Sequence, residues 1–239
     1  MRVPRIYHPS ALKEGSEVTL RPQAQRHLRT VLRLRPGAPL ILFDGEGHAC
    51  RASLRENDTA AVGPPLESDT ESPLNLHLLQ GVSKGERMDH VVQKATELGV
   101  TTITPVLTRR CVVRLVGERA EKRLRHWREI VIHACEQCGR NRLPLLREIT
   151  PLDEALNHTG SGMKLVLNPA DGKNLGALQP PQTGVTLLVG PEGGLSEEEN
   201  RQAIRHGFVG LRLGPRTLRT ETAPIAALSA LQTLWGDLG

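Results

Sequence analysis

The stretch VTLLVGPEGGLSEEE, Val185–Glu199, decides the fold. Its first five residues are apolar except for one threonine, which is typical of a strand buried on both faces of a parallel sheet. The glycines and the proline that follow predict a tight turn. Ser196, with Glu199 three residues later, predicts a capping box at the start of a helix. A buried strand that runs directly into a helix predicts an α/β domain with a mainly parallel sheet.

The same alternation of strand and helix extends on both sides of this stretch. Apolar runs predict strands at residues 74–82, 100–108, 164–169 and 208–214. One helix is expected over Glu86–Leu98, ended by Gly99, and a second over Arg119 to about Cys138. We expect Thr222 to cap the final helix, with Pro224 in its first turn.

The first 70 residues have a different pattern, with short strands around one helix. The helix is expected over Ala24–Leu32, with Leu28, Val31 and Leu32 on one face. Residues 38–54 read as a hairpin whose turn contains Asp44 and Gly45. Residues 63–73 are rich in proline, glycine, serine and acids, which predicts a linker. We therefore expect one domain over residues 1–70 and a second over residues 73–239.

Composition excludes some classes of protein. Hydrophobic residues make up 38% of the 239 residues, enough for a core. No apolar run reaches the roughly 18 residues of a membrane span, and the start MRVPRIYHPS lacks the apolar segment of a signal peptide. Cys135 and Cys138 are close in sequence, but no second pair of ligands has similar spacing. We expect a cytoplasmic protein with reduced cysteines, no membrane segment and no metal site.

The basic residues are unevenly distributed. The net charge is +5, and residues 21–35 hold five arginines and no acid. Residues 109–147 hold eleven lysines and arginines against four glutamates. Either stretch alone also fits a solvated helix face, but two of them favour a polyanionic partner, with nucleic acid as the first candidate. Aromatic residues make up only 2%, which argues against a base-stacking sheet.

Three turns follow predicted strands: Leu167–Gly172, Gly190–Ser196 and Leu213–Ala223. Ligands of open parallel sheets bind beyond the carboxyl ends of the strands. One such segment alone fits an ordinary tight turn, but three at neighbouring strand ends predict a pocket. Glycine-rich dinucleotide and P-loop motifs are missing, and so is the G-x-S-x-G nucleophile elbow. Hydride transfer, P-loop hydrolysis and a serine triad are therefore disfavoured.

Four motifs together resemble the RsmE family of the SPOUT superfamily: residues 82–100 (VSKGERMDHVVQKATELGV), 136–144 (EQCGRNRLP), 187–199 (LLVGPEGGLSEEE) and 213–223 (LGPRTLRTETA). This family methylates N3 of a uridine in 16S ribosomal RNA with S-adenosylmethionine. The resemblance implies a small PUA-like β-barrel that contacts RNA, followed by a SPOUT-type α/β domain with a C-terminal trefoil knot. It also implies a homodimer with the active site near the subunit interface.

The resemblance also implies roles for single residues. The cofactor would be held by Leu167, Asn168, Gly190, Pro191, Glu192, Gly193, Leu213, Gly214 and Leu218. The RNA or small ribosomal subunit would be contacted by Arg29, Arg33, Arg109, Glu136, Gln137, Arg140, Arg142 and Arg216.

Two residues of the segment LRTETA are candidates for the chemistry itself. Uracil N3 must lose its proton before it attacks, and a cation near the uracil oxygens stabilises the resulting anion. Arg219 is the candidate for that cation. Glu221 is expected either to orient Arg219 or to stabilise the start of the last helix.

Several points remain open at the level of sequence. The proton acceptor is undecided, with water as one candidate. Another knotted methyltransferase acting on transfer-RNA ribose or base is an alternative, and so is a non-enzymatic RNA-binding assembly factor.

Overall fold

The computed structural model describes residues 3–113, 115–168 and 172–239 and separates the chain into two compact units. The first unit takes the chain up to Glu71 together with Ile132–Leu143, and the second takes Ser72–Val131 and Pro144–Gly239. The sequence-based domains assign residues 132–143 to the C-terminal domain, whereas their contacts group them with the N-terminal one.

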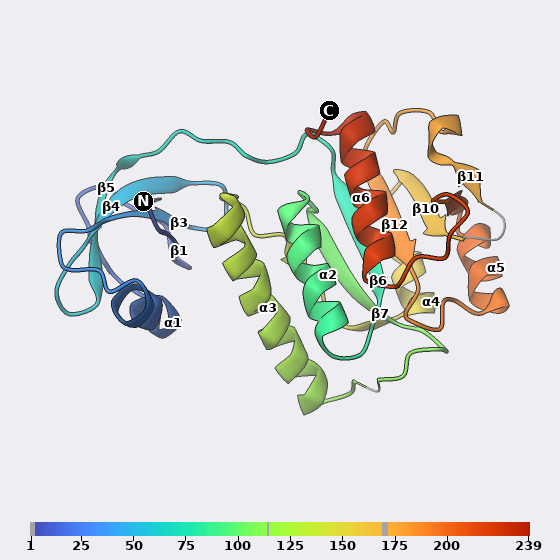
Figure 1. Ribbon diagram of the computed structural model, residues 1–239, viewed down its shortest axis with the longest axis horizontal. Helices are drawn as coiled ribbons and strands as arrows, with labels where there is room; N and C mark the ends of the chain where they lie inside the picture. Colours follow the sequence, from blue (N-terminus) through green and yellow to red (C-terminus); the bar gives the residue numbers. More distant parts are fainter. Residues whose placement is uncertain (1–2, 114, 169–171) are drawn as a thin grey trace. The chain divides into compact units, whose positions relative to one another are not determined.

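The first unit is built on five strands, β1 (Arg5–Tyr7), β2 (Glu17–Thr19), β3 (Pro39–Phe43), β4 (Ala49–Leu54) and β5 (Thr59–Pro65). They form one sheet in the order β1-β3-β4-β5-β2, in which only the β1–β3 pair is parallel (Figure 1). The predicted hairpin is confirmed as β3 and β4. Asp44 shapes its turn, because its Oδ1 accepts hydrogen bonds from the backbone N–H groups of Glu46 and His48, at 2.7 and 3.1 Å.

The predicted helix of the first unit is present, but its buried face differs. The helix α1 (Pro22–Arg26) continues into a wider turn, η1 (His27–Val31), where the N–H of Leu32 bonds to the carbonyl of His27. Leu28 is fully buried, whereas Val31 and Leu32 are exposed. The prediction that these three residues share one buried face is therefore wrong, because the wider turn rotates the later residues away from the core.

The linker predicted over residues 63–73 begins inside a strand. Gly63, Pro64 and Pro65 are the last residues of β5, and Pro65 lies opposite Cys50 of β4. Proline is tolerated there because the pairing of β5 with β2 stops at Ala61, so the missing N–H breaks no bond with that neighbour.

Residues 132–143 are tied to the first unit by polar bonds. Glu136 Oε1 accepts a hydrogen bond from the Tyr7 backbone at 3.1 Å. Arg140 is buried, and its Nη2 lies 2.6 Å from Glu71 Oε2. Asn141 donates to the Ser68 carbonyl at 2.8 Å. A buried arginine needs a neighbouring opposite charge, so the contact with Glu71 explains why Arg140 groups with the first unit.

The second unit contains a parallel sheet of eight strands. They are β6 (Leu76–Gly81), β7 (Thr102–Leu107), β8 (Leu145–Leu146), β9 (Thr150–Pro151), β10 (Met163–Leu167), β11 (Lys173–Asn174), β12 (Val185–Val189) and β13 (Val209–Arg212). The order is β11-β13-β10-β12-β6-β7-β8, and β9 also pairs with β7. The predicted parallel α/β sheet is confirmed, and β12, from the stretch that opened the sequence analysis, lies in its middle with all five residues buried.

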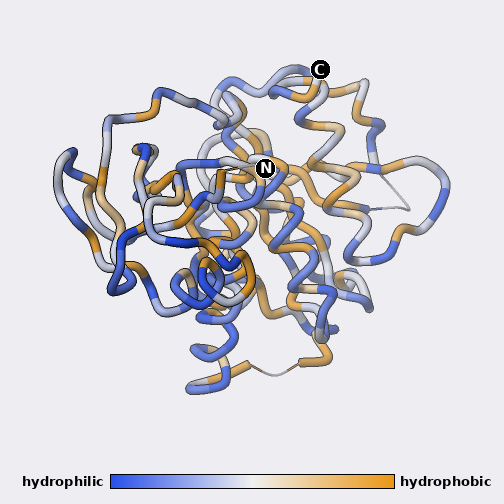
Figure 2. Tube along the Cα trace, turned by 60° about the vertical axis from the view of Figure 1, so that its left-hand side comes forward, coloured by the Kyte–Doolittle hydropathy of each residue, from blue (hydrophilic) through white to orange (hydrophobic). Residues whose placement is uncertain are grey.

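Helices cover both faces of this sheet, which explains the continuous apolar runs. The helices of this unit are α2 (Glu86–Glu97), the part of α3 (Glu118–Cys138) up to Val131, α4 (Leu152–Asn157), α5 (Glu197–Arg205) and α6 (Thr222–Trp235), with a short turn η2 (Leu175–Ala177). Helices α2 and α6 lie side by side over the central strands (Figure 1). Residues of α4 and α5 pack with Leu79, Val166 and Leu188 of β6, β10 and β12. Hydrophobic segments accordingly gather along the packed strands and helices (Figure 2).

Helix caps explain where two of these helices begin. The predicted capping box is confirmed, since Ser196 accepts from the Glu199 N–H and Glu199 accepts from the Ser196 N–H. The predicted cap at Thr222 is wrong: Thr222 is the first helical residue, and Glu221 occupies the cap position without a side-chain cap bond. Pro224 lies in the first turn as expected. The short elements α4, β8, β9 and β11 were not predicted, because they are too brief to show periodicity.

The cysteines are free thiols, with Cys50 and Cys135 buried. Burial raises the pKa of the Cys135 thiol to about 12. No cluster of histidine, cysteine or acidic side chains suited to a metal ion occurs within residues 3–113, 115–168 and 172–239. In the same residues, no helix combines the length and apolar character that crossing a membrane requires.

Candidate active site

A cavity of about 720 Å³ lies at the carboxyl ends of the central strands of the second unit. It is lined by Leu167 and Asn168 after β10, by residues 189–195 at the end of β12, and by residues 217–221 before α6. Strands β13, β10 and β12 are neighbours in the sheet. The three predicted segments therefore do meet in one pocket. Of the first segment, Pro169, Ala170 and Asp171 lie outside the described residues.

The turn after β12 has glycines for two different reasons. A Cβ on Gly190 would lie 2.9 Å from Gly194 C and from Leu195 N, so only glycine fits there. Gly194 has a φ of +66°, which favours glycine. Gly190 and Gly193 do not have positive φ. Gly194 N–H bonds to the Pro191 carbonyl at 2.8 Å and closes the turn.

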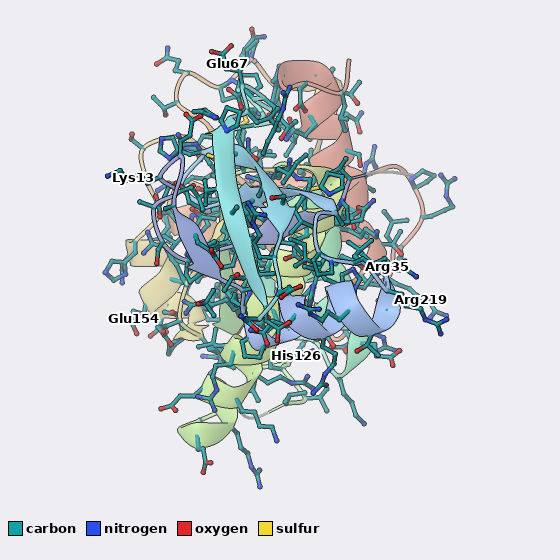
Figure 3. The ribbon with its side chains drawn as sticks, turned by 90° about the vertical axis from the view of Figure 1, so that its left-hand side faces the viewer. Lys13, Arg35, Glu67, His126, Glu154 and Arg219 are labelled. Carbon is teal, nitrogen blue, oxygen red and sulfur yellow. The ribbon has the colours of Figure 1, made fainter. Side chains whose placement is uncertain are left out.

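Thr220 fastens the last loop against this turn. It is buried, and its hydroxyl donates to the Gly190 carbonyl at 2.9 Å and lies 3.3 Å from the Ser83 hydroxyl. Because Thr220 points inward, the residues on either side of it, Arg219 and Glu221, are held beside the cavity, and both line it. Arg219 itself is exposed (Figure 3).

Two carboxylates and one arginine form a charged cluster at the cavity. Glu192 Oε1 accepts hydrogen bonds from the Lys84 backbone N–H at 2.8 Å and from Arg87 Nη1 at 3.0 Å. Arg87 Nε lies 3.8 Å from Glu221 Oε2. Burial alone would raise the pKa of Glu192, but these hydrogen bonds and the positive charge of Arg87 lower it below its ordinary value. Arg87 therefore joins the turn after β12 to the loop before α6.

Three cavity oxygens have no hydrogen-bond partner among the described residues. They are Glu192 Oε2, Asn200 Oδ1 and Glu221 Oε2, and all three are buried atoms. Buried polar atoms are normally satisfied, so unpaired ones in a pocket indicate a ligand with positive or hydrogen-donating groups.

Sequence reasoning missed two arginines of this site. Arg87 belongs to a quoted motif but received no role, and Arg110 lies near the predicted Arg109. Arg110 Nη1 donates to the Gly193 carbonyl at 2.9 Å and to the Leu195 carbonyl at 3.3 Å. It therefore braces the turn after β12 from outside. The only sequence signal for Arg87 and Arg110 was that they lie in or near recognised motifs. Their partners, Glu192 and Gly193, lie 105 and 83 positions away in the sequence, so the pairing could not be predicted from local patterns.

A smaller cavity of about 70 Å³ shares Leu167, Asn168 and Leu218 with the larger one and adds Leu213, Gly214 and Arg216 to its wall. The nine residues predicted to hold the cofactor thus line one or both of two neighbouring cavities.

The predicted RNA contacts are spread over both units. In the second unit, the side chains of Arg109 and Arg216 are exposed, and the Arg109 N–H bonds to Glu199 at 2.7 Å. In the first unit, Arg33 and Arg142 are exposed, and Arg29 reaches Asp58 Oδ1 at 2.6 Å.

Residues Glu136, Gln137 and Arg140 lie in different surroundings. Glu136 and the exposed Gln137 line a mostly apolar cavity of about 630 Å³ within the first unit. Glu136 is also bonded to Tyr7, and Arg140 is buried against Glu71. The guanidinium of Arg140 is therefore committed to packing, and it is not presented to a nucleic acid.

Comparisons with known proteins agree with this architecture. A family model described as an RNA methyltransferase domain matches residues 70–232, and one described as an RNA methyltransferase PUA domain matches residues 20–59. A parallel α/β domain with a cavity at its strand ends, joined to a PUA-like unit, defines the class of two-domain RNA methyltransferases.

Similar proteins narrow this class. A ribosomal RNA small subunit methyltransferase E from Buchnera aphidicola is 35% identical and covers 99% of this chain and 98% of its own length. The protein of the same name from Bacillus subtilis is 28% identical over 92% of this chain and 91% of its own. The chain belongs to the ribosomal RNA small subunit methyltransferase E (RsmE) family.

Two solved structures show the same fold over their full length. A methyltransferase from Legionella pneumophila, in complex with the cofactor SAM, matches with 45% identity and a TM-score of 0.94. A ribosomal RNA small subunit methyltransferase E from Neisseria gonorrhoeae, bound to S-adenosyl methionine, matches with 45% identity and a TM-score of 0.93. Each of the two covers all of this chain and is itself covered completely.

Proposed function

We propose that this protein uses S-adenosylmethionine to methylate N3 of a specific uridine in the 16S ribosomal RNA of the small subunit. The observation that carries the proposal is the cavity formed by three loops at neighbouring strand ends, most of whose lining residues belong to the family motifs. Related structures with this fold bind S-adenosylmethionine.

The cavity fits this cofactor in size and charge. A volume of about 720 Å³ lies in the range of small-molecule sites, roughly 300–1,000 Å³. The donor carries positive charge on its sulfonium and its amino group, and the cavity wall offers the carboxylate of Glu192, whose Oε2 accepts no hydrogen bond from the described residues. Glycine at position 190 lets the turn after β12 fold closely against Gly194 and Leu195 at the cavity wall.

The residues proposed to hold the cofactor are Leu167, Asn168, Gly190, Pro191, Glu192, Gly193, Leu213, Gly214 and Leu218. When bound, the cofactor supplies a methyl group on a positively charged sulfur, so the reaction needs neither a metal nor a covalent enzyme intermediate. The contribution of these residues is positioning, which aligns donor and acceptor.

Arg219 is the proposed electrostatic catalyst. Deprotonation of N3 spreads negative charge over the uracil oxygens, and a fixed guanidinium beside them lowers the energy of that state. Arg219 is exposed at the cavity, on a loop fixed by its buried neighbour Thr220. Arg216, on the same loop, is proposed to bind phosphate. Because N3 lies on the Watson–Crick edge, the target uridine must be unpaired or flipped out.

The first unit is proposed to bind the RNA, as its PUA-type family model indicates. Arg29, Arg33, Gln137 and Arg142 are the contacts proposed there, and Arg109 is proposed in the second unit. The homodimer and the trefoil knot are carried over from the family resemblance.

Nucleoside analysis of a deletion strain tests the proposal. Loss of 3-methyluridine from 16S RNA, restored by the plasmid-borne gene, is expected. Loss of a methylated transfer-RNA nucleoside with 16S RNA unchanged would point to another methyltransferase activity. A purified protein with no affinity for S-adenosylmethionine would point to a non-enzymatic assembly factor.

A further inference from the structure

Glu221 has an arrangement that differs from that of Glu192 in one respect. Both carboxylates line the same cavity, both contact Arg87, and both have side chains that are 21% exposed. The Oε2 atoms of both carboxylates accept no hydrogen bond from the described residues, but Glu192 Oε1 accepts two, from the Lys84 N–H and from Arg87. Hydrogen bonds to a carboxylate stabilise its ionised form and weaken it as a base. Glu221 is therefore the better proton acceptor of the pair.

The charges around Glu221 suit this role. Arg87, at the start of α2, lies 3.8 Å from Oε2 and fixes the position of the carboxylate at the cavity wall. Arg219 precedes Glu221 by two residues on the same loop, while Glu192 and Arg110 come from the turn after β12 and the segment after β7. The cluster therefore pairs a carboxylate whose Oε2 accepts no hydrogen bond from the described part of the chain with a separate cation for the substrate.

The loop holds these two groups at fixed places. Thr220 between them is buried and bonded to the Gly190 carbonyl, and the Arg219 carbonyl accepts the N–H groups of Thr222 and Ala223, both at 2.9 Å. Arg219 and Glu221 thus belong to a single turn anchored to the end of β12. A base and a cation that act on one ring require such a shared, rigid support.

We propose that Glu221 is the proton acceptor for uracil N3 and that Arg87 is the positioning residue that holds its carboxylate at the cavity wall. This inference rests on the proposed function. The N3–H bond breaks, the proton moves to the Glu221 carboxylate, and the electron pair that stays on N3 forms the new bond to the methyl group. The bond from that methyl group to sulfur would break with its electron pair staying on sulfur, so that S-adenosylhomocysteine is the second product. Arg219 stabilises the negative charge meanwhile, and the proton passes from Glu221 to water after the product leaves.

The test compares full-length protein and its Glu221→Gln variant on small subunits purified from the deletion strain. Single-turnover rates of 3-methyluridine formation are measured from about pH 6 to about pH 9, above the ordinary carboxylate range. The wild-type rate is expected to be nearly flat. The variant is expected to be slower by about 100- to 10,000-fold near neutral pH. Its rate should rise about tenfold per pH unit, because hydroxide then removes the proton.

A second substrate sharpens the result. Small subunits that contain 5-fluorouridine, whose N3–H is more acidic, are expected to rescue Glu221→Gln by a larger factor than they accelerate the wild type. A merely structural role for Glu221 would give no such selective rescue. Arg87→Lys, which keeps the charge, is expected to retain more activity than Arg87→Met.

Controls separate chemistry from folding and binding. Isothermal titration with S-adenosylmethionine and a thermal melt should show that Glu221→Gln is folded and binds the cofactor. If Glu221→Gln does not fold, Glu221→Asp is the second variant to be measured. Glu197→Gln, on an exposed residue outside the cavity, should behave as wild type.

Each outcome decides the matter. A slow variant with a flat pH profile, or a variant as fast as wild type, overturns the role of Glu221 and leaves the proposed function standing. Wild-type protein that binds S-adenosylmethionine but forms no 3-methyluridine overturns the proposed function and this inference together.

Discussion

At the scale of single residues, one buried side chain anchors the loop before α6. Thr220 donates a hydrogen bond to the Gly190 carbonyl and fixes the loop, and its neighbours Arg219 and Glu221 line the cavity on either side of it. A short segment can thereby present a cation and a carboxylate without a helix or strand of its own.

Replacement of Arg219 separates substrate activation from cofactor binding. Arg219→Ala is expected to lower the methylation rate by at least about 100-fold, because a lost charge-stabilising group typically costs roughly 3–4 kcal/mol. Affinity for S-adenosylmethionine should change little. Isothermal titration and a methyl-transfer assay measure the two effects, and near-normal turnover would end the proposed role.

Replacement of Gly190 should instead act mainly on the affinity for S-adenosylmethionine. In Gly190→Ala the new Cβ would meet Gly194 and Leu195 backbone at 2.9 Å, so the turn must shift and cofactor affinity should fall at least about tenfold. Calorimetric titration with S-adenosylmethionine measures the change. Gly160→Ala is the matched control, since nothing lies within 4 Å of its Cβ and its φ is not positive; equal affinities in the two variants would contradict the prediction.

At the scale of elements, neighbouring strands create environments that no single strand contains. His77 of β6 lies beside Thr104 of β7, with Nε2 and Oγ1 2.8 Å apart. Burial first, and then the positive charge of Arg147, lower the pKa of His77 to about 4. The imidazole is therefore neutral in the folded protein over most of the physiological range.

This shift predicts acid destabilisation. The unfolded imidazole titrates near about pH 6.5, so the unfolded state binds the proton first. The contribution of His77 to stability is complete above that pH and is lost as the pH falls toward about 4, at up to about 1.4 kcal/mol per unit. Urea unfolding at several pH values in this range gives the free energy of unfolding as a function of pH. This free energy should change less steeply with pH for His77→Gln than for wild type. An unchanged slope would refute the assignment, and His90→Gln, on an exposed helix position, is the control.

At the scale of the whole molecule, the proposed methyl transfer and the proposed RNA binding are assigned to different units. The second unit holds both site cavities, and the first holds the basic stretch 21–35 together with residues 132–143. Within the first unit, Lys13 and Arg35 lie at opposite sides (Figure 3). This separation offers a matched pair of positions for testing which surface meets the RNA.

RNA binding should weaken steeply with salt, because arginine–phosphate contacts release counterions. Arg33→Gln is expected to reduce the slope of log K against log salt by about one. Lys13→Gln removes the same charge outside the basic stretch and should leave the slope unchanged. Fluorescence anisotropy with a labelled 16S fragment measures both, and a slope that does not depend on salt would rule out the basic stretch as the RNA surface.

The sequence by itself determined the five longer strands of the second unit, the hairpin of the first unit, the long helices, the capping box at Ser196 and the three segments that form the cavity. These features follow from hydrophobic periodicity and turn chemistry, which are local. Two predictions from local patterns were wrong. The wide turn His27–Val31 leaves Val31 and Leu32 exposed, and Glu221 occupies the cap position that was predicted for Thr222.

Only the tertiary structure decided which charged groups meet. The bridge from Arg87 to Glu192 and Glu221, the brace from Arg110 to Gly193, and the burial of Arg140 against Glu71 all join residues far apart in sequence. Such pairings depend on how strands are ordered and loops are packed, which periodicity along one chain does not encode.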